Sequence, residues 1–380
     1  MSTDPRETAR VLVAGGGVAA LESALALRDL AEDRVEVELL APDREFVYRP
    51  LAVAEPFHER SLLRFDLAGL AQAAGVRHRF GGLAAVYPGK RRARTTRGDV
   101  LEYDALVLAV GARIQNAVPG ALTFSGHEDV PAMKRLIEDM LTDAAADLVF
   151  AVPSSIGWHL PLYELALLTA SYLTERGLSA NLAIVTPETA PLAIFGDAAS
   201  EAVARLLSER GITLRAETYP REFDGSVLHV VPGAPIQAGR VVAIPRLVGP
   251  AVPGVPHDDN GFIPVDAHGR VKGLRDVYAA GDVTAFPIKQ GGLATQQADA
   301  VAEQIAADVG APVDPKPFDP VLRGLLLTGA APEFLRAEIS RSSRRTSTAA
   351  ADALWWPPGK IAGRYLGPFL AERAELAYTY

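Results

Sequence analysis

Residues 10–25 read RVLVAGGGVAALESAL, an apolar run that ends in three glycines and continues with leucines one helical turn apart. The run predicts a buried strand, and the spacing of Leu21 and Leu25 predicts a helix behind it. A second strand is predicted for VEVELL at residues 35–40, one helix length further on. Strand, helix and strand within about 30 residues form the βαβ unit of a parallel sheet, so we expect an α/β fold.

The glycines belong to a turn that fits the pattern G-x-G-x-x-(G/A). The turn consists of Gly15, Gly16, Gly17, Val18, Ala19 and Ala20. Gly15 permits a tight turn, Gly17 lets the backbone approach a pyrophosphate, and the small Ala20 lets the helix pack closely on the strand. The start of the helix then offers N–H groups to the phosphates. The turn therefore predicts a dinucleotide cofactor, with a glycine turn that binds no ligand as the alternative.

The end of the second strand lacks the acidic residue that usually binds a ribose hydroxyl. The chain reads LLAPD at residues 39–43, which puts Ala41 at the expected position. Glu38 and Asp43 are neighbours, but neither occupies it. We therefore expect the ribose contact near Ala41 to be made by backbone or water.

The composition argues against several classes of partner and metal site. The chain has 380 residues, a net charge of −8, 49% hydrophobic and 22% charged residues, and no cysteine. An acidic chain is a poor match for a nucleic-acid partner held by its phosphates. Without cysteine there is no thiolate zinc site, iron–sulfur cluster or disulfide redox centre. The seven histidines form no cluster with metal-ligand spacing, so we expect no metal.

A second βαβ pattern follows Pro119-Gly120. It consists of a strand at residues 147–152, a helix from about 161 to 175 and a strand at 182–185. Prolines and glycines cluster again between residues 245 and 256, which indicates a linker back to the first unit.

The remaining segments complete this layout. We expect strands at residues 261–266 and 277–282, a helix from about 292 to 308, and a polar loop at 340–353. The predicted domains are a split dinucleotide-binding domain, an inserted domain and a C-terminal cap. Their limits are 1–117 with 251–316, 118–250, and 317–380.

Three segments resemble flavoproteins of the pyridine nucleotide-disulfide oxidoreductase superfamily, which carry two dinucleotide-binding domains. YDALVLAVGA at 103–112 resembles their YDxLVLATGA strand, and VYAAGDV at 277–283 resembles their second FAD signature. PIKQGGLATQQ at 287–297 resembles the flavin-facing turn and helix of type II NADH dehydrogenases and sulfide:quinone oxidoreductases. The resemblance implies two Rossmann-like domains with parallel sheets, and FAD as cofactor.

The same resemblance implies site residues. The further cofactor-binding positions are Gly111, Ala112, Gly281, Asp282, Gln290, Gly292 and Leu293. Asp282 would bind the ribityl chain. Lys289 and the helix start would stabilise reduced flavin, since negative charge collects at its N1–C2=O edge. Gln296 matches a quinone-pocket position loosely, and Trp158-His159 is expected on the turn that faces the flavin, as a substrate contact or as core.

Two departures from the family are visible. Sulfide oxidation in the family needs a pair of redox cysteines, which this chain lacks. The nicotinamide-binding turn should read G-x-G-x-x-G-x-E, but residues 157–164 read GWHLPLYE and keep only the first glycine. NAD(P)H binding in the usual manner is therefore not expected, although Glu188 follows the next strand where a ribose-binding acid would sit.

We therefore predict an FAD-dependent oxidoreductase that passes two electrons through flavin N5 to a quinone-like or other small-molecule acceptor. Two alternatives stay open: an NAD(P)H-dependent reductase of a small redox protein, and a flavin-binding protein that has lost catalysis. The N-terminus has no apolar signal-peptide region and no segment is long enough to span a membrane, so a cytoplasmic location is expected. An apolar pattern near residues 355–370 leaves two alternatives, peripheral contact with the inner face of a membrane or a helix that covers the flavin domain. A homodimer also stays open.

Overall fold

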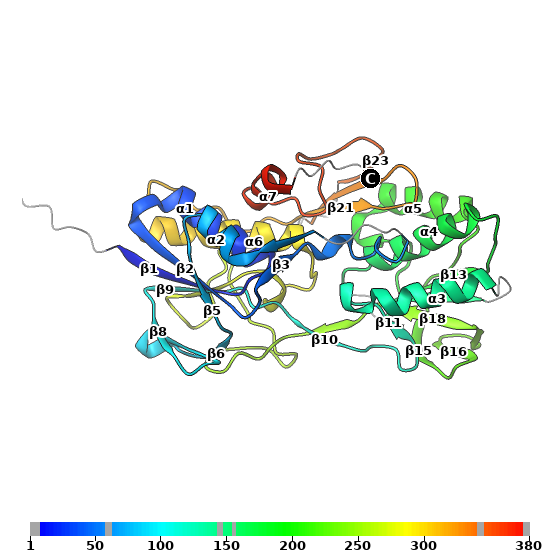
Figure 1. Ribbon diagram of the computed structural model, residues 1–380, viewed down its shortest axis with the longest axis horizontal. Coiled ribbons are helices and arrows are strands. Elements are labelled where there is room, and N and C mark those ends of the chain that lie inside the picture. Colours follow the sequence, from blue (N-terminus) through cyan, green and yellow to red (C-terminus); the bar gives the residue numbers. More distant parts are fainter. Residues whose placement is uncertain (1–7, 58–62, 143–146, 154–156, 340–345, 375–380) are drawn as a thin grey trace, which may run out of the picture.

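The computed structural model describes residues 8–57, 63–142, 147–153, 157–339 and 346–374 (Figure 1). Two parallel sheets form the two halves of the molecule, which confirms the predicted α/β class with two Rossmann-like sheets. The first sheet contains, in spatial order, β20 (Val277–Ala279), β9 (Ala105–Leu108), β1 (Ala9–Ala14), β2 (Val35–Ala41) and β5 (Arg77–Phe80). Its strands come from both ends of the predicted split domain.

Helices cover one face of the first sheet and a small antiparallel sheet covers the other. The helices are α1 (Val18–Ala31), α2 (Leu67–Ala73) and α6 (Gly291–Asp308). The antiparallel sheet consists of β6 (Leu83–Tyr87), β7 (Arg92–Thr95) and β8 (Val100–Glu102). Because both faces are covered, β9 and the stretch Val11–Ala14 of β1 are apolar, as is usual for parallel sheets.

The second sheet lies in the other half of Figure 1. It contains, in spatial order, β11 (Leu122–Thr123), β18 (Arg240–Ala243), β12 (Leu148–Ala151), β13 (Leu182–Val185) and β14 (Thr213–Arg215). One face packs on α3 (Val130–Thr142), α4 (Leu160–Thr174) and α5 (Asp197–Glu209). The other face packs on β15 (Tyr219–Phe223), β16 (Val227–Val231) and β17 (Ile236–Gln237). Along β12, Phe150 faces the helices and Val149 faces the small sheet, as strand geometry requires.

Short elements join the halves and close the chain. The connecting pair is β10 (Arg113–Gln115) with β19 (Arg246–Val248), and a second short pair is β3 (Glu45–Val47) with β4 (Arg64–Asp66). The C-terminal part forms β21 (Val321–Leu326), β22 (Glu333–Glu338), β23 (Ser347–Ala350) and α7 (Leu366–Ala374). The 3-10 turns are Glu32–Arg34, Arg49–Leu51, Pro88–Lys90, His127–Asp129, Ala193–Phe195 and Gly281–Val283.

Two local predictions were wrong. The segment 261–266 forms no strand and makes only isolated bridges from Ile263 and Val265, because Pro264 between them has no N–H to donate. The polar stretch at 340–353 is not a loop throughout, since Ser347–Ala350 pairs with β22; residues 340–345 lie outside the described residues. The predicted domain limits stay a prediction.

Apolar residues of the pattern near the C-terminus pack in the core of the protein. Ile361, Leu366 and Leu370 are buried in the same core as α1. Trp355 packs edge-on against Phe334, with ring centroids 5.1 Å apart. No helix among the described residues is long and apolar enough to cross a membrane.

Candidate functional site

A continuous cavity of about 1370 Å³ lies where the two halves meet. Its lining comes from the turns after β1, β9 and β20 in the first half and from the turn after β12 in the second. Parallel sheets commonly bind ligands at the carboxyl ends of their strands. The cavity exceeds the roughly 300–1,000 Å³ typical of one small-molecule site. It therefore has room for a dinucleotide and a second molecule.

The glycine turn lies at one end of this cavity, and its three glycines have different surroundings. Gly15 has φ +137°, and a Cβ there would lie 2.1 Å from the carbonyl oxygen of Ala109. A Cβ on Gly16 would lie 2.9 Å from Leu67 Cδ2. A Cβ on Gly17 would meet no atom within 4 Å, because this position faces the cavity. The fold itself needs the first two glycines, while Gly17 leaves space for a ligand.

The start of α1 supplies the polar part of this cradle. Gly17 is the N-cap and provides no side-chain acceptor, and the first turn of the helix holds no acidic residue. The first N–H groups of a helix are unpaired and attract anions. Val18 and Ala19 line the cavity, while Ala20 is buried beneath them against the core. The site therefore fits the pyrophosphate of FAD.

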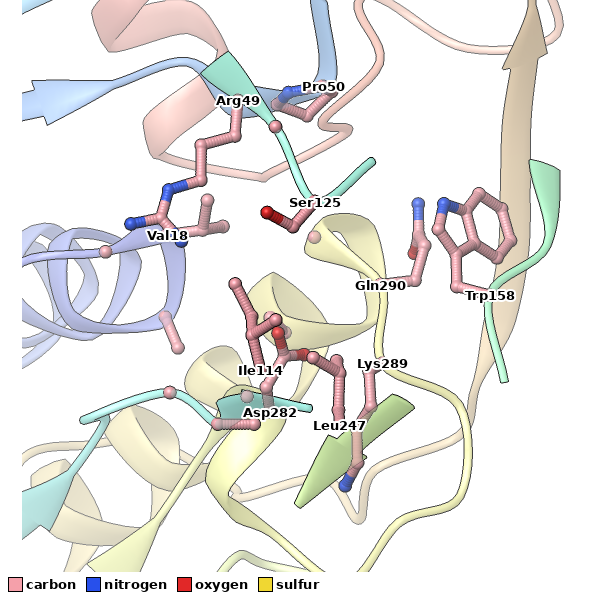
Figure 2. A pocket seen from close by; sticks show the side chains of 18 of the residues that line it. Val18, Arg49, Pro50, Ile114, Ser125, Trp158, Leu247, Asp282, Lys289 and Gln290 are labelled. Carbon is pink, nitrogen blue, oxygen red and sulfur yellow. The ribbon is translucent and has the colours of Figure 1, made fainter. Parts of the chain in front are cut away.

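Asp282 lies beside this turn because Gly281 packs on α1. A Cβ on Gly281 would come within 2.9 Å of the Ala19 Cβ, so only glycine allows the approach. The Gly281 N–H donates to Gln297 Oε1 at 2.7 Å, which fixes the end of β20. Burial raises the pKa of the Asp282 carboxyl, while the positive charges of Lys289 and Arg49 oppose the rise. Figure 2 shows Asp282 among the lining side chains, where it can accept a hydrogen bond from a sugar-alcohol hydroxyl.

Lys289 lines the cavity, but its ammonium group is engaged elsewhere. Nζ donates to the Thr284 carbonyl and lies 3.9 Å from the centre of the Phe262 ring. Burial lowers the pKa of Lys289 to about 8, against the opposing charges of Asp282 and Asp258. A stabilising charge at the flavin edge stays a prediction for this residue.

The first turn of α6 is held by Gln290, which lines the cavity. Its Oε1 accepts from the Leu293 N–H at 2.8 Å, and its Nε2 donates to the Arg323 carbonyl at 3.1 Å. Gly292 and Leu293 are buried within the helix and are not among the lining residues. Gln296 also lies outside the lining, where its Nε2 donates to the carbonyls of Gly292 and Val321. The Gln296 amide is therefore used inside the protein: one bond lies within α6, and the other holds β21 against α6.

Some of the other predicted cofactor positions line the cavity, and others do not. Gly111 and Ala112, after β9, line the cavity. Ala41 is fully buried and is not a lining residue, whereas Asp43 lines the cavity. Glu38 is paired with Arg79 at 2.6 Å and is not a lining residue.

Trp158 and His159 line the second half of the cavity, ahead of α4. The Trp158 ring lies 5.7 Å from the Phe195 ring. His159 Nδ1 lies 3.3 Å from Glu188 Oε1, and both side chains are buried.

Glu188 is the acid expected to bind a ribose, and its carboxylate is occupied within the protein. Tyr163 Oη donates to Glu188 Oε2 at 2.8 Å and Thr186 Oγ1 donates to the same oxygen at 3.0 Å. Together with His159, these groups tie up the carboxylate in a buried cluster. Ser154 and Ser155, which could have rebuilt the turn, lie outside the described residues.

Sequence reasoning missed a buried ion pair at the cavity, formed by Glu164 on α4 and Lys360 near the C-terminus. Lys360 Nζ lies 2.6 Å from both carboxyl oxygens of Glu164, and the Leu327 N–H donates to Oε1 at 2.8 Å. Burial raises the pKa of Glu164 and lowers that of Lys360. Burial thus opposes the charged form of each group, and the charge of the partner stabilises it.

Two arginines of the lining were also missed. Arg49 precedes Pro50 in a short turn, and its charge acts on Asp282. Arg323 lies on β21. An arginine in a polar turn or a strand carries no local signal of its role, whereas Glu164 was at least marked by the last position of the G-x-G-x-x-G-x-E pattern.

Comparisons with known proteins agree with this geometry. The family described as pyridine nucleotide-disulphide oxidoreductase matches residues 164–302, so the match begins after the Gly157 turn. An NADH dehydrogenase-like protein of Mycobacterium tuberculosis is 26% identical over 300 residues, which are 73% of each chain. The sulfide-quinone reductase of Aquifex aeolicus is 22% identical over 330 residues, 79% of this chain and 76% of that one.

Solved structures show the same fold. The sulfide:quinone oxidoreductase of Aquifex aeolicus superposes with a TM-score of 0.80 at 21% identity, over 90% of this chain and 87% of that one. A ferredoxin reductase of Rhodopseudomonas palustris gives 0.66 at 20% identity, over 87% and 82%. The family match, the relatives and the fold all support the predicted FAD-dependent oxidoreductase, similar to the pyridine nucleotide-disulphide oxidoreductases, although the chain has no cysteine.

Proposed function

We propose that this oxidoreductase passes two electrons to a quinone-like acceptor that binds in the cavity beside the Glu164–Lys360 pair. The pair is the observation that carries the proposal. Reduction of a quinone to a hydroquinone consumes two electrons and two protons. FAD, when bound, supplies the two-electron chemistry. One proton would come with the two electrons as a hydride from the flavin, and the buried Glu164–Lys360 pair at the cavity wall can donate the other.

The cavity wall near this pair suits an apolar ring. Leu160, one helical turn before Glu164, and Ile361, next to Lys360, line the cavity, as does Trp158. Gln290 lies next to the start of α6, and Figure 2 shows it at the same end of the view as Trp158. In this proposal, FAD binds at the other end of the cavity, beside Gly17.

NAD(P)H is a poor candidate for the electron donor. The Glu188 carboxylate is already bonded to Tyr163 and Thr186, so a ribose would have to break those bonds. Pro161 in the first turn of α4 has no N–H to offer a phosphate. These features favour a different donor, which enters from the same cavity.

The test is a half-reaction that needs no donor. The yellow holoprotein is reduced anaerobically with dithionite and mixed with menadione in a stopped-flow instrument, and the return of flavin absorbance is followed. We expect reoxidation faster than that of free FAD under the same conditions. The double variant Glu164→Gln/Lys360→Met should slow it at least tenfold, whereas Lys316→Met, in an exposed pair with Asp314, should leave it unchanged.

Two results would contradict the proposal. One is reoxidation by menadione no faster than free FAD. The other is rapid bleaching of the oxidised protein by NADH or NADPH together with slow transfer to quinones, which would favour a reductase of a small redox protein.

A further inference from the structure

Arg323 differs from the other arginines that line the cavity, which are exposed, because it is partly buried and has no acidic side chain beside it among the described residues. It is half-buried on β21 and lines the cavity. Within the described residues, its guanidinium makes no ion pair or hydrogen bond, and the Gln290 amide bonds only to its backbone carbonyl. A half-buried charge without a partner is costly, so such a group commonly has a ligand to bind.

A second arginine raises the free-energy cost of keeping Arg323 charged. Arg323 stands directly opposite Arg336 in the antiparallel β21–β22 pair, and like charges in this position repel. Arg336 is balanced by Glu338, whose Oε1 lies 2.8 Å from its Nη2, but Arg323 has no such acid. Burial lowers the pKa of Arg323, and the charge of Arg336 lowers it further. Both effects oppose the charged form, and an anion in the cavity would relieve them.

Apolar and aromatic side chains pack on β21, on the face opposite to the Arg323 side chain. A Cβ on its neighbour Gly324 would lie 2.7 Å from Leu160 Cδ1 and 2.6 Å from Phe195 Cζ. Phe195 in turn packs on Trp158. Leu325 has the same orientation as Arg323, since side chains alternate along a strand, and it also lines the cavity. Arg323 lines the same cavity as Trp158, Leu160 and Leu325, whose side chains suit a planar apolar ring.

We propose that Arg323 binds the anionic oxygen of the acceptor, so that the preferred acceptors are planar apolar rings carrying a carboxylate or an acidic hydroxyl. The inference rests on the proposed function, since it names the substrate class of that site. A guanidinium binds a carboxylate or an enolate with charge-assisted hydrogen bonds, which are stronger than those to a neutral carbonyl. Charge on the ring then becomes the feature by which substrates are distinguished.

The test compares the binding of two naphthoquinones to the oxidised holoprotein by titration calorimetry. Lawsone has an acidic hydroxyl that is ionised at neutral pH, and menadione is neutral. We expect Arg323→Gln to weaken lawsone binding roughly 10- to 100-fold and to change menadione binding less than about threefold. Arg323→Lys should retain part of the affinity. The matched control is Arg336→Gln, which removes the neighbouring charge outside the lining and should not weaken lawsone binding.

A second measurement separates ligand binding from a structural role. If Arg323 exists for a ligand, Arg323→Gln removes a repulsion and the ligand-free protein should melt at the same or a higher temperature. A lower melting temperature, or equal losses for lawsone and menadione, would overturn the inference. So would inorganic phosphate that displaces lawsone at equal concentration, because the site would then bind any anion.

The outcomes also separate this inference from the proposed function. Lawsone binding through Arg323 without quinone-dependent reoxidation would remove the quinone acceptor and keep the anion site. Fast reoxidation by both quinones with no effect of Arg323→Gln would keep the acceptor and remove the anion site.

Discussion

Replacing Lys360 by methionine should destabilise the protein by about 3–5 kcal/mol, because Glu164 is then left buried without its counter-charge. Lys360 Nζ lies 2.6 Å from both Glu164 oxygens, and the two side chains are 5% and 0% exposed. After the substitution, the Leu327 N–H is the one hydrogen-bond donor left to this carboxylate among the described residues. Methionine keeps most of the volume of the lysine stem, so a cavity contributes little to the loss.

Urea unfolding of the holoprotein, followed by circular dichroism and flavin fluorescence, measures the effect. The double variant Glu164→Gln/Lys360→Met should recover most of the loss, since both charges are gone. Lys316→Met should leave the midpoint unchanged, because its partner Asp314 is exposed. If Lys360→Met is as stable as the wild type, or if the double variant is no better than the single one, the two groups do not neutralise each other.

Gly17→Val should lose FAD and keep its fold, because the new side chain enters open space in the cavity. Gly89→Val is the control: its side chain also enters open space, but outside the lining, so full flavin content should remain. Flavin absorbance per protein measures the cofactor, and circular dichroism measures the fold. Burial, with the charge of Glu22, raises the pKa of Asp299 from its ordinary 3.8 to about 8. The folded protein therefore keeps a proton that the unfolded chain releases, and the free energy of unfolding should fall as pH rises from about 4 to about 8. In urea titrations, Asp299→Asn should reduce this dependence of stability on pH. An unchanged pH dependence would contradict the prediction. NADH and NADPH should bind with dissociation constants on the order of millimolar by calorimetry, and Glu188→Gln should not strengthen binding; micromolar binding would restore the reductase alternative.

The absence of cysteine gives one more outcome. Sulfide-dependent quinone reduction should not exceed the uncatalysed rate, because there is no thiolate to form a persulfide.

The parts of the site that the sequence could predict are those encoded within a few residues. The glycine turn needs one strand, one helix start and three glycines in a row, and each glycine has a separate steric reason. Asp282 is preceded by Gly281, whose close approach to Ala19 places the acid beside the turn. Such local patterns can be recognised because the backbone conformation that they require is uncommon.

The parts that the sequence could not predict depend on contacts between distant segments. Lys360 meets Glu164 across 196 positions of the chain, and no local pattern at either residue indicates the other. Gln296 was expected in a quinone pocket, but whether its amide faces the cavity or β21 depends on where Val321 lies. Similarly, Glu188 has the position of a ribose-binding acid in the sequence, and only the folded contacts with Tyr163 and Thr186 occupy it.

This division has a physical consequence for how the protein acquires its specificity. The glycine turn and Asp282, at the proposed cofactor end of the cavity, belong to the first sheet and its turns. Arg323 and Lys360, in contrast, both come from the C-terminal part, and each brings a positive charge to the cavity. Substitutions at Arg323 should alter which acceptor is used, while substitutions at Gly17 should remove every activity together.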